Sequence, residues 1–200
     1  MPVTRSLTET RELIEALRPR FSGEIRLDRF DRLLYSTDAS IYRIEPLAVL
    51  IPRGHEDVAA AVESAAHFRV PILPRGAGTS LAGQTVGAAI VLDFSKCMNR
   101  VLEVDAEGRK ARVQPGVVLD QLNAHVRSAG LQFGPDVATS NRATIGGMIG
   151  NNSCGARSVL YGKMVDHVVE LRAVIPGGPE IRLSADALAQ RVVCYLAPQD

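Results

Sequence analysis

Residues 47–73 constrain the fold most, because two short apolar runs there flank a helical pattern. The run LAVLI at 47–51 lies between prolines and predicts a buried strand, and PIL at 71–73 predicts a second one. Between them, Glu56 and Asp57 favour a helix start, since acidic side chains stabilise the N-terminal end of a helix. The apolar face of this helix is predicted to be Val58, Val62, Ala65 and Ala66. A strand–helix–strand unit of this kind predicts parallel strands.

The region before this unit contains one further predicted helix, over residues 6–17. Ser6 and Glu9 fit a capping pattern, and an apolar stripe at helical spacing follows. The stripe consists of Leu13, Ile14 and Leu17. The polar stretch 28–42 has no clean period and is expected to be an ordered loop. We therefore divide the chain into an N-terminal helix and lead-in loop, 1–45, and a main domain, 46–200.

The second half of the chain has more local strand pairing. Strands are predicted over 89–93, 101–104, 111–114, 167–175 and 180–183, and a helix is predicted from Val118 to near Gly130. Glu107-Gly108 is typical of a hairpin turn, and so is the Pro/Gly run 176–179. The residues after Leu183 contain no element that we place, and we expect a fragment of a longer protein. The mixture predicts the α+β class, with an antiparallel part after the parallel unit.

The first glycine-rich segment, PRGAGTSLAGQTVG at 74–87, directly follows a predicted strand. Glycine permits positive φ, and successive N–H groups in such a turn form an anion-binding nest. The segment lacks the lysine of a Walker loop. A Rossmann loop would need a helix next, and the residues before the next strand are poor helix formers. These residues therefore predict either a loop-held phosphate or merely a tight connection.

The second glycine-rich segment covers residues 134–155 and is dense in Gly, Asn, Ser and Thr. Ordering such a stretch costs much chain entropy and buries little apolar surface, which indicates a large polar ligand. We expect polar groups for the edge of a heteroaromatic ring from Asn151, Asn152 and Ser153, and packing on its face from Ile145, Met148 and Ile149. The alternative is a long loop without a ligand. Two such segments, each after a strand, favour the ligand.

Together these motifs identify a resemblance. PRGAGTSLAGQ, then GPD, then TIGGMIGNNSCGARSVLYGKMVDHV resemble the FAD-binding domain of the vanillyl-alcohol oxidase (p-cresol methylhydroxylase, PCMH) flavoprotein family. The closest branch is that of FAD-linked D-lactate, glycolate and D-2-hydroxyglutarate dehydrogenases, which YSTDASIY at 35–42 also resembles. The resemblance spans about residues 20–178. It implies a two-subdomain PCMH-type fold, truncated at the C-terminus and without the substrate-binding cap.

The resemblance also implies which residues contact FAD. The first segment would wrap the pyrophosphate through Pro74, Arg75, Gly76, Ala77, Gly78, Thr79, Ser80 and Gln84. The second would contact the isoalloxazine, ribityl chain and pyrophosphate through Pro135, Asp136, Thr144, Gly146, Gly147, Asn151, Gly155, Ala156, Tyr161 and Gly162. Some relatives attach the flavin through a histidine in the first loop, and this loop has none, which implies non-covalent FAD. Asp136 has the alternative role of starting the turn after Pro135.

The implied reaction is oxidation of a 2-hydroxy acid, with electrons passing to an iron–sulfur region, a quinone or a cytochrome. No residue is identified as the catalytic base, and no metal site is expected. The alternatives are a non-catalytic flavin-binding fragment, or a relative that acts on a sugar lactone or an aromatic alcohol. His67 and His125 are expected to be surface or boundary residues. His167 is a candidate for a position beside the flavin, and Cys154 is expected to be buried.

Composition limits the partners and the compartment. The chain has 200 residues, with 23 basic and 22 acidic side chains spread without long runs of like charge. This balance indicates neither nucleic acid nor a membrane surface as a partner. No signal peptide or transmembrane segment is expected. Cys97, Cys154 and Cys194 fit neither a disulfide framework nor a zinc site. We expect a cytoplasmic protein, and leave open its association with the cytoplasmic side of the membrane.

Overall fold

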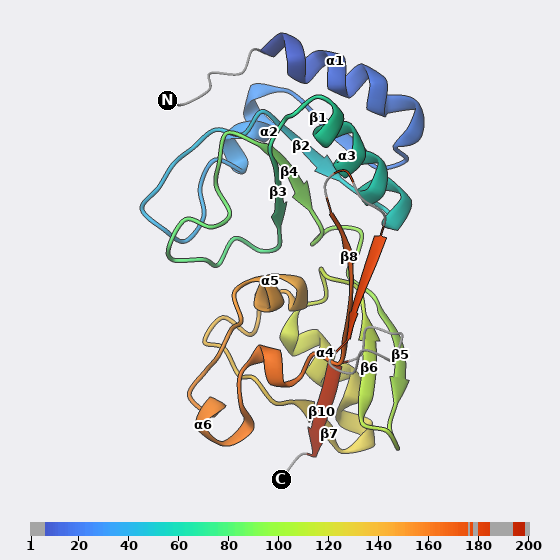
Figure 1. Ribbon diagram of the computed structural model, residues 1–200. Helices are drawn as coiled ribbons and strands as arrows, with labels where there is room; N and C mark the ends of the chain where they lie inside the picture. The colour runs from blue at the N-terminus through green and yellow to red at the C-terminus, as the bar shows by residue number, and fades with distance from the viewer. Residues whose placement is uncertain (1–6, 176, 178–179, 185–193, 199–200) are drawn as a thin grey trace. The chain divides into compact units, whose positions relative to one another are not determined.

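The computed structural model of the protein describes residues 7–175, 177, 180–184 and 194–198. The chain forms two compact units. The first lies within Met1–Cys97 and Val174–Glu180, and the second lies within Met98–Ala173 and Ile181–Asp200. Both contain helices and strands, so the α+β class is confirmed (Figure 1).

The first unit is built on a four-stranded sheet with the order β1-β2-β4-β3. These strands are β1 (Glu24–Arg26), β2 (Ala48–Ile51), β4 (Ile90–Asp93) and β3 (Ile72–Arg75). Strands β2 and β3 each pair in parallel with β4, and β1 pairs antiparallel with β2. The predicted parallel strand–helix–strand unit is confirmed, but β4 lies between its two strands. The pairing of β4 could not be read from residues 47–73 alone.

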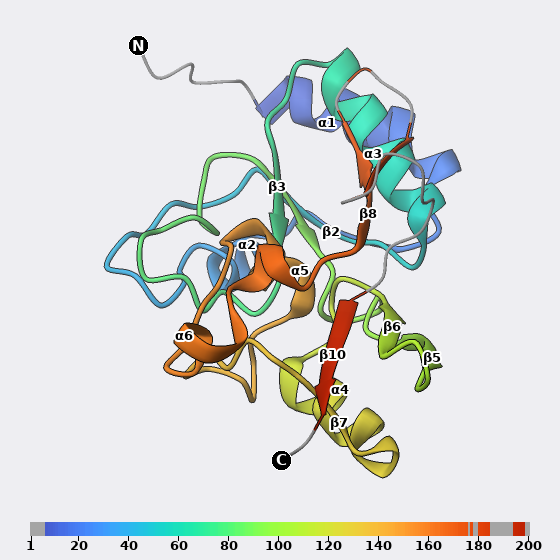
Figure 2. The same ribbon diagram turned by 60° about the horizontal axis from the view of Figure 1, so that its bottom comes forward.

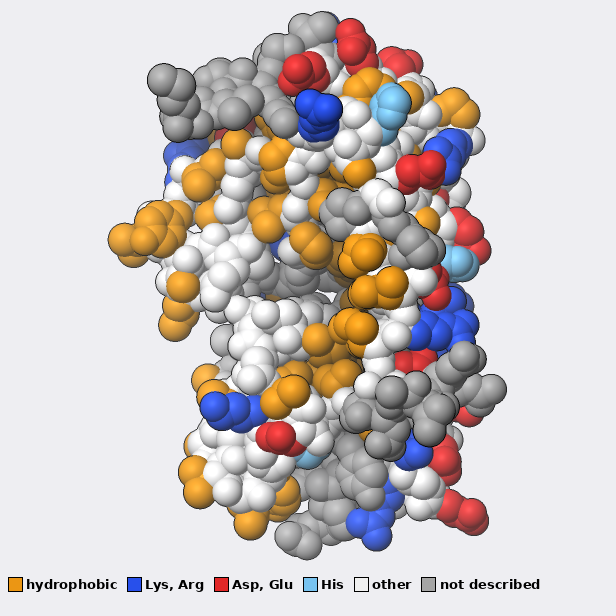
Figure 3. All heavy atoms as spheres, viewed as in Figure 1, with side chains coloured by type: hydrophobic (Ala, Val, Ile, Leu, Met, Phe, Trp, Pro, Cys, Tyr) orange, Lys and Arg blue, Asp and Glu red, His pale blue; other side chains and the backbone are white. Residues whose placement is uncertain are grey.

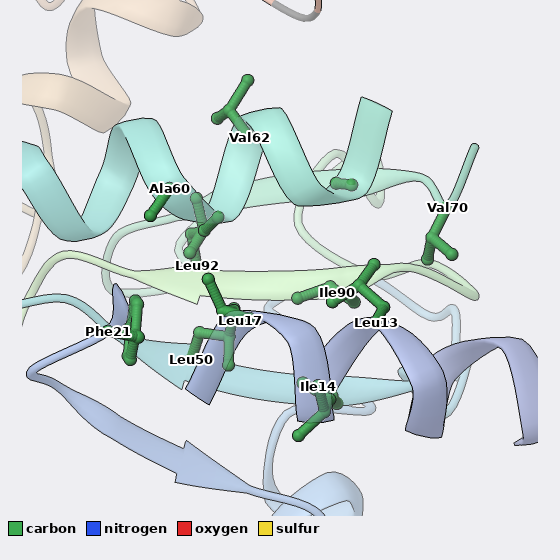
Figure 4. Packing of buried hydrophobic residues seen from close by; sticks show 13 residues of the cluster. Leu13, Ile14, Leu17, Phe21, Leu50, Ala60, Val62, Val70, Ile90 and Leu92 are labelled. Carbon is green, nitrogen blue, oxygen red and sulfur yellow. The ribbon is translucent and has the colours of Figure 1, made fainter. Parts of the chain in front are cut away.

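Helices α1 (Leu7–Leu17) and α3 (His55–His67) cover one face of this sheet. They lie side by side in two views (Figures 1 and 2). The stripe predicted for the first helix is confirmed, since its side chains at 13, 14 and 17 are fully buried. Figure 4 shows them packed with Leu50 and Leu92 of the sheet. On α3, Val62 and Ala65 are buried as predicted. The predicted cap residue Ser6 lies outside the described residues.

The other face of the sheet carries Val49, Ile51 and Val91, which are all fully buried. Side chains alternate between the two faces of a strand, so these residues point away from α1 and α3. Tyr35 and Leu73 are partly buried against them. Tyr35 comes from the stretch 28–42, which was expected to be a loop. That expectation is wrong at Arg29–Leu34, which form helix α2, because Asp28 caps it by accepting from the Asp31 N–H.

The second unit contains the antiparallel sheet β5-β6-β10-β7. Its strands are β5 (Val101–Asp105), β6 (Lys110–Val113), β10 (Cys194–Pro198) and β7 (Leu131–Phe133). The predicted hairpin around Gly108 is confirmed, and the Gly108 N–H donates to the Asp105 carboxylate. Strand β10 falls in the tail where no element was placed. It pairs with both β6 and β7, and such long-range pairing leaves little local signal.

Helix α4 (Leu119–Val126) packs on the core of the second unit through Leu119, Leu122 and Val126. A 3-10 turn, η2 (Arg127–Ala129), extends it to Gly130, whose φ of 67° ends it where the sequence predicted. The unit also contains helices α5 (Ile145–Gly150) and α6 (Ser158–Tyr161) and a 3-10 turn, η3 (Met164–Asp166). The sequence had assigned no helix to this region.

Strands β8 (Glu170–Val174) and β9 (Glu180–Ser184) form a two-stranded sheet. They confirm the strands predicted over 167–175 and 180–183, except that β8 begins later, because η3 ends at Asp166 and His167 follows it as the C-cap residue. In the Pro/Gly run 176–179, only Gly177 lies among the described residues. The remaining 3-10 turn, η1 (Arg18–Arg20), follows α1. No helix in the described part of the chain is long and apolar enough to cross a membrane.

Large apolar side chains are also exposed on each unit, and Figure 3 shows apolar side chains at the surface of one face. In the first unit, Ile41, Tyr42 and Leu81 are each more than half exposed. In the second unit, Val159 and Leu160 are. The first three lie in or beside the first glycine-rich segment and the stretch 35–42, so the surface of this region is partly apolar.

Candidate functional site

The first glycine-rich segment connects β3 to β4 without a helix, as predicted. Pro74 and Arg75 end β3, and residues 76–81 then form an irregular loop. Gly78 has a φ of 69°, a left-handed conformation that favours glycine. Within the described part of the chain, the backbone N–H groups of residues 76–81 donate to no protein acceptor. These donors are therefore available to an anion.

Arg75 was predicted to contact the pyrophosphate. In the structure its guanidinium donates to backbone carbonyls of the loop and of the chain before the main domain. Its Nη1 donates to the carbonyls of Tyr35 and Thr85 at 3.2 and 2.9 Å, and its Nη2 donates to that of Thr37 at 2.8 Å. A Cβ on Gly78 would lie 2.6 Å from Nη2. Burial lowers the pKa of the Arg75 guanidinium from its ordinary value. The Arg75 side chain therefore connects strand β3 to the glycine-rich loop at Thr85 and to the chain at Tyr35 and Thr37.

A second set of contacts joins the loop to residues 35–42, which we call the lead-in segment. The Asp38 carboxylate accepts from the Thr85 hydroxyl at 2.9 Å and from the Ser40 N–H at 2.8 Å. The Ala39 N–H donates to the Gly78 carbonyl at 3.0 Å. Burial alone would raise the pKa of the Asp38 carboxyl, but these hydrogen bonds hold it below its ordinary value. The sequence alone did not indicate that the lead-in segment contacts the site.

The far end of the loop is shaped by its own side chains. The Ser80 hydroxyl accepts from the N–H groups of Ala82 and Gln84, both at 3.4 Å. Gly83 has a φ of 75°, and a Cβ there would lie 2.6 Å from the Tyr42 ring. The loop is thus ordered by contacts within the first unit, and its free N–H groups remain at 76–81.

The second glycine-rich segment lies in the second unit, where α5 forms. The Thr144 hydroxyl caps α5 by accepting from the Gly147 N–H at 3.3 Å. The Gly146 N–H donates to the Pro115 carbonyl at 2.8 Å. The expectation that Ile145 and Met148 pack on a ring face is wrong, because both are buried in the core of the unit. In contrast to the first loop, the start of α5 uses its N–H groups within the protein.

The asparagines after α5 also contact protein groups. The Asn151 side chain donates to the Gly147 carbonyl at 2.9 Å, and the Asn152 side chain accepts from the Val165 N–H at 2.9 Å. Asn152 has a φ of 44°, which asparagine tolerates better than most residues. The Asn151 bond closes the end of α5, and the Asn152 bond connects that end to the chain at η3.

Asp136 holds the rest of the second segment together. Its carboxylate accepts from the backbone N–H and the Nε of Arg157, at 3.0 and 2.9 Å. Burial alone would raise the pKa of Asp136, but the bonds from Arg157 hold it below its ordinary value. A Cβ on Gly155 would overlap the Asp136 carbonyl, so glycine permits a close backbone approach here. Ala156 lies between these two contacts and is exposed.

His167 is the candidate histidine that the structure buries. Its Nε2 lies 2.6 Å from the Tyr161 carbonyl, which makes Nε2 the donor. Its ring packs edge-on against Phe133, with centroids 5.4 Å apart, and a Cβ on Gly134 would meet it. His167 therefore supports the turn before Pro135 and the end of α6, where Gly162 has a φ of 84°. His67 and His125 are exposed, as predicted.

The predicted site residues thus fall into two sets, each held together within its own unit. The first set comprises the last two residues of β3 and the loop after it, and the second lies in and around α5 and α6. Cys154 is exposed, so the expectation of a buried packing residue is wrong, and Cys97 is partly buried. Among the described residues, no group of three or more His, Cys, Asp or Glu side chains is placed to hold a metal ion.

Comparisons with known proteins identify the family. Residues 46–184 match the model of a family described as the FAD binding domain. D-2-hydroxyglutarate dehydrogenase of Pantoea ananatis is 44% identical over 184 residues, which cover 90% of this chain and 18% of that protein. Glycolate oxidase subunit GlcD of Bacillus subtilis is 42% identical over 168 residues, which cover 82% of this chain and 35% of that subunit.

The fold is also that of a solved structure, alkyldihydroxyacetonephosphate synthase. The two superpose with a TM-score of 0.81 at 22% identity, over 94% of this chain and 39% of that one. The chain spans 18% and 35% of the length of the two sequence relatives. The match over residues 46–184 covers both glycine-rich segments and confirms the resemblance drawn from them. The chain belongs to the FAD binding domain family.

Proposed function

We propose that this chain is the flavin-binding part of an FAD-dependent oxidoreductase that oxidises a 2-hydroxy acid. The observation that carries the proposal is the family match over residues 46–184, together with relatives named for D-2-hydroxyglutarate and glycolate. D-2-Hydroxyglutarate, glycolate and D-lactate share a hydroxyl on the carbon beside a carboxylate. The substrate class is therefore proposed at that level, and the individual acid is left to experiment.

The geometry of the first loop supports the proposal that it binds the FAD pyrophosphate. Its N–H groups at 76–81 have no acceptor among the described residues, and Gly78 holds the backbone in a left-handed turn. The Arg75 guanidinium beside it forms no ion pair within the described chain, which leaves positive charge near the loop. Free donors with a nearby cation suit a diphosphate. Pro74, Thr79, Ser80 and Gln84 are proposed to complete this part of the site.

The second set of residues is proposed to contact the flavin ring, the ribityl chain and the pyrophosphate. Its members are those named from the sequence, from Pro135 and Asp136 to Tyr161 and Gly162. Many of its polar groups already bond within the protein, as at Thr144 and Asn151. This supports a preformed surface whose shape is fixed by these side-chain bonds. Backbone atoms and the Tyr161 ring of this surface are then proposed to contact the cofactor.

When bound, FAD would accept two electrons and the hydrogen from the substrate carbon, and the hydroxyl proton would pass to a base. This chain's own residues bind and orient the cofactor. The site needs a proton acceptor, and no side chain of this chain is assigned that role. We propose that the base and the substrate pocket are supplied outside this chain, because it spans 18% of the length of the D-2-hydroxyglutarate dehydrogenase relative.

The attachment of the cofactor, the electron acceptor and the location are proposed from the sequence. Residues 74–87 contain no histidine for a covalent bond, so FAD is proposed to bind non-covalently. An iron–sulfur region, quinone or cytochrome is proposed as the electron acceptor. The widely spaced cysteines favour a reducing compartment, and we propose the cytoplasm, including its membrane face. The boundary between residues 45 and 46 stays a prediction. The lead-in segment lies before this boundary and contacts the glycine-rich loop that lies after it.

The proposal is tested by the visible spectrum of the purified chain after reconstitution with FAD. Bound flavin that bleaches when D-lactate, glycolate or D-2-hydroxyglutarate is added anaerobically supports a competent enzyme. Bound flavin that stays oxidised supports a flavin-binding fragment without catalysis. Bleaching only by a sugar lactone or an aromatic alcohol would replace the substrate class. A folded chain that retains no FAD would overturn the proposal.

A further inference from the structure

The lead-in segment, residues 35–42, is joined to the first glycine-rich loop and its strand by several hydrogen bonds. The Arg75 guanidinium binds the carbonyls of Tyr35 and Thr37, and the Ala39 N–H binds the loop at Gly78. The Asp38 carboxylate binds the Thr85 hydroxyl. Residue 38 is 47 positions away from residue 85, so these contacts bring together parts of the chain that are distant in sequence.

Arg75 is the centre of this arrangement. Both hydrogens of its Nη1 are used, one towards Tyr35 and one towards Thr85, so the same nitrogen bridges the lead-in segment and the far side of the loop. Its carbon Cζ also lies 5.3 Å from the centre of the Tyr35 ring, within the range of a cation–π contact. A planar fork of donors suits this task, and the single nitrogen of lysine does not.

Asp38 fixes the other end of the loop. Its carboxylate accepts a hydrogen bond from the Thr85 hydroxyl at 2.9 Å. The backbone carbonyl of the same Thr85 accepts a hydrogen bond from Arg75, also at 2.9 Å. The loop from Arg75 to Thr85 is therefore closed at its base by two side chains that converge on one residue. The loop's free N–H groups at 76–81 lie between these two fixed points.

We propose that Arg75, Asp38 and Thr85 are positioning residues that hold the cofactor loop in its binding shape. In this inference they act on FAD through the backbone of residues 76–81, and the guanidinium of Arg75 serves the loop more than the phosphate. The inference rests on the proposed function, because it concerns the affinity of the same site. It assigns to the lead-in segment a part in cofactor binding, although the family model begins at residue 46.

The decisive variants are Thr85→Val and Thr85→Ser. Valine keeps the shape of threonine but lacks the hydroxyl that donates to the Asp38 carboxylate, whereas serine retains that hydroxyl. We expect T85V to raise the Kd for FAD several-fold and T85S to retain the wild-type Kd. Arg75→Lys should raise the Kd about tenfold or more, because a charged group loses hydrogen bonds to two of its three carbonyls. The exposed Arg53, changed to lysine, is the matched control and should leave the Kd unchanged.

Affinity is measured by quenching of flavin fluorescence at 10 °C, with circular dichroism to verify that each variant is folded. If T85V and T85S bind FAD equally, the positioning role of the hydroxyl is wrong. If R75K binds as the wild type does, the role of the fork is wrong. Should R75K fail to fold, the threonine pair decides alone. A double variant, R75K with T85V, should lose less than the product of the single losses, because both act on one loop.

A second readout separates this inference from the proposed function. Hydrogen exchange of the apo chain at Ala39, whose N–H donates to Gly78, should accelerate in T85V and not in T85S. This measurement needs no cofactor. If the wild-type chain does not bind FAD but the exchange differs as expected, the connection is real and the proposed function fails. If the exchange is identical in both variants, the inference itself is overturned.

Discussion

The phenol of Tyr35 donates to the buried carboxylate of Asp93 across 2.6 Å. Asp93 ends β4 and also accepts from the N–H and hydroxyl of Ser95. Burial, followed by the bond to this carboxylate, raises the pKa of the phenol well above its ordinary value. Because Tyr35 begins the lead-in segment, this bond anchors that segment to the sheet.

Tyr35→Phe should lower the free energy of unfolding by about 1.5–3 kcal/mol, the usual cost of losing a hydrogen bond to a charged group. The loss arises because the buried carboxylate of Asp93 keeps only its Ser95 donors. Urea denaturation of the apo chain measures it. Tyr42→Phe is the control, since that ring is 53% exposed and its hydroxyl has no partner in the described structure. Equal losses in the two variants would contradict the role of the Asp93 bond.

Glu24 predicts a pH dependence of stability. Hydrogen bonds from Lys96 and then from Arg26 lower the pKa of its carboxyl from 4.5 to about 2. A carboxyl whose pKa is lower in the folded state stabilises the fold above its unfolded pKa, and this contribution is lost as the pH falls. Stability should therefore decrease between about pH 4.5 and 2. The side chain is 35% exposed, so solvent screening keeps the effect below about 1 kcal/mol.

The measurement compares the wild type with Glu24→Gln by urea denaturation at several pH values. The two stability curves should converge near pH 2 and separate above pH 4.5. Glu63→Gln removes an ion pair with Arg20 in which both side chains are more than half exposed, and it should follow the wild type. A Glu24→Gln curve parallel to that of the wild type throughout would show that Glu24 has no folded-state shift.

Much of the fold could be predicted because it is written in local patterns. The stripe at Leu13, Ile14 and Leu17 and the turn at Gly108 follow from spacing and turn chemistry alone. In contrast, β10 is positioned by pairing with β6 and β7, which are distant in sequence. Helix α5 was missed because three of its six residues are glycine, and its start depends on the Thr144 cap and the Pro115 carbonyl.

In the candidate site, too, some features could be predicted from the sequence and others depend on contacts made only in the fold. The glycines could be found from the sequence, because a left-handed turn at Gly78 and a close approach at Gly155 require that residue. The contacts of Arg75 could not, since its acceptors are backbone carbonyls that any residue provides. The polar residues of YSTDASIY were a signal for the lead-in segment, but their partners become visible only in the fold.

Gly155 predicts a local packing limit in the second unit. Gly155→Ala should lower the free energy of unfolding by about 2 kcal/mol or more, because the new Cβ would overlap the Asp136 carbonyl and the backbone must shift. Gly150→Ala is the control, since a Cβ there meets nothing within 4 Å. That change should be neutral or stabilise by about 0.5–1 kcal/mol, because alanine favours the helix. Similar destabilisation by both changes, in thermal or urea denaturation, would argue against the close approach.

Gly78 predicts a direct link between backbone conformation and cofactor retention. Its φ of 69° disfavours any side chain, and a Cβ would lie 2.6 Å from Nη2 of Arg75. Gly78→Ala should cost about 1–2 kcal/mol of stability, and Gly78→Val should in addition abolish FAD retention, because the loop leaves its binding shape. Gly87→Ala is the matched control in the same segment, where the nearest atom would be 3.6 Å from the new Cβ. The flavin-to-protein absorbance ratio after gel filtration measures retention. A folded Gly78→Val chain that retains FAD as the wild type does would show that the nest at residues 76–81 does not hold the pyrophosphate.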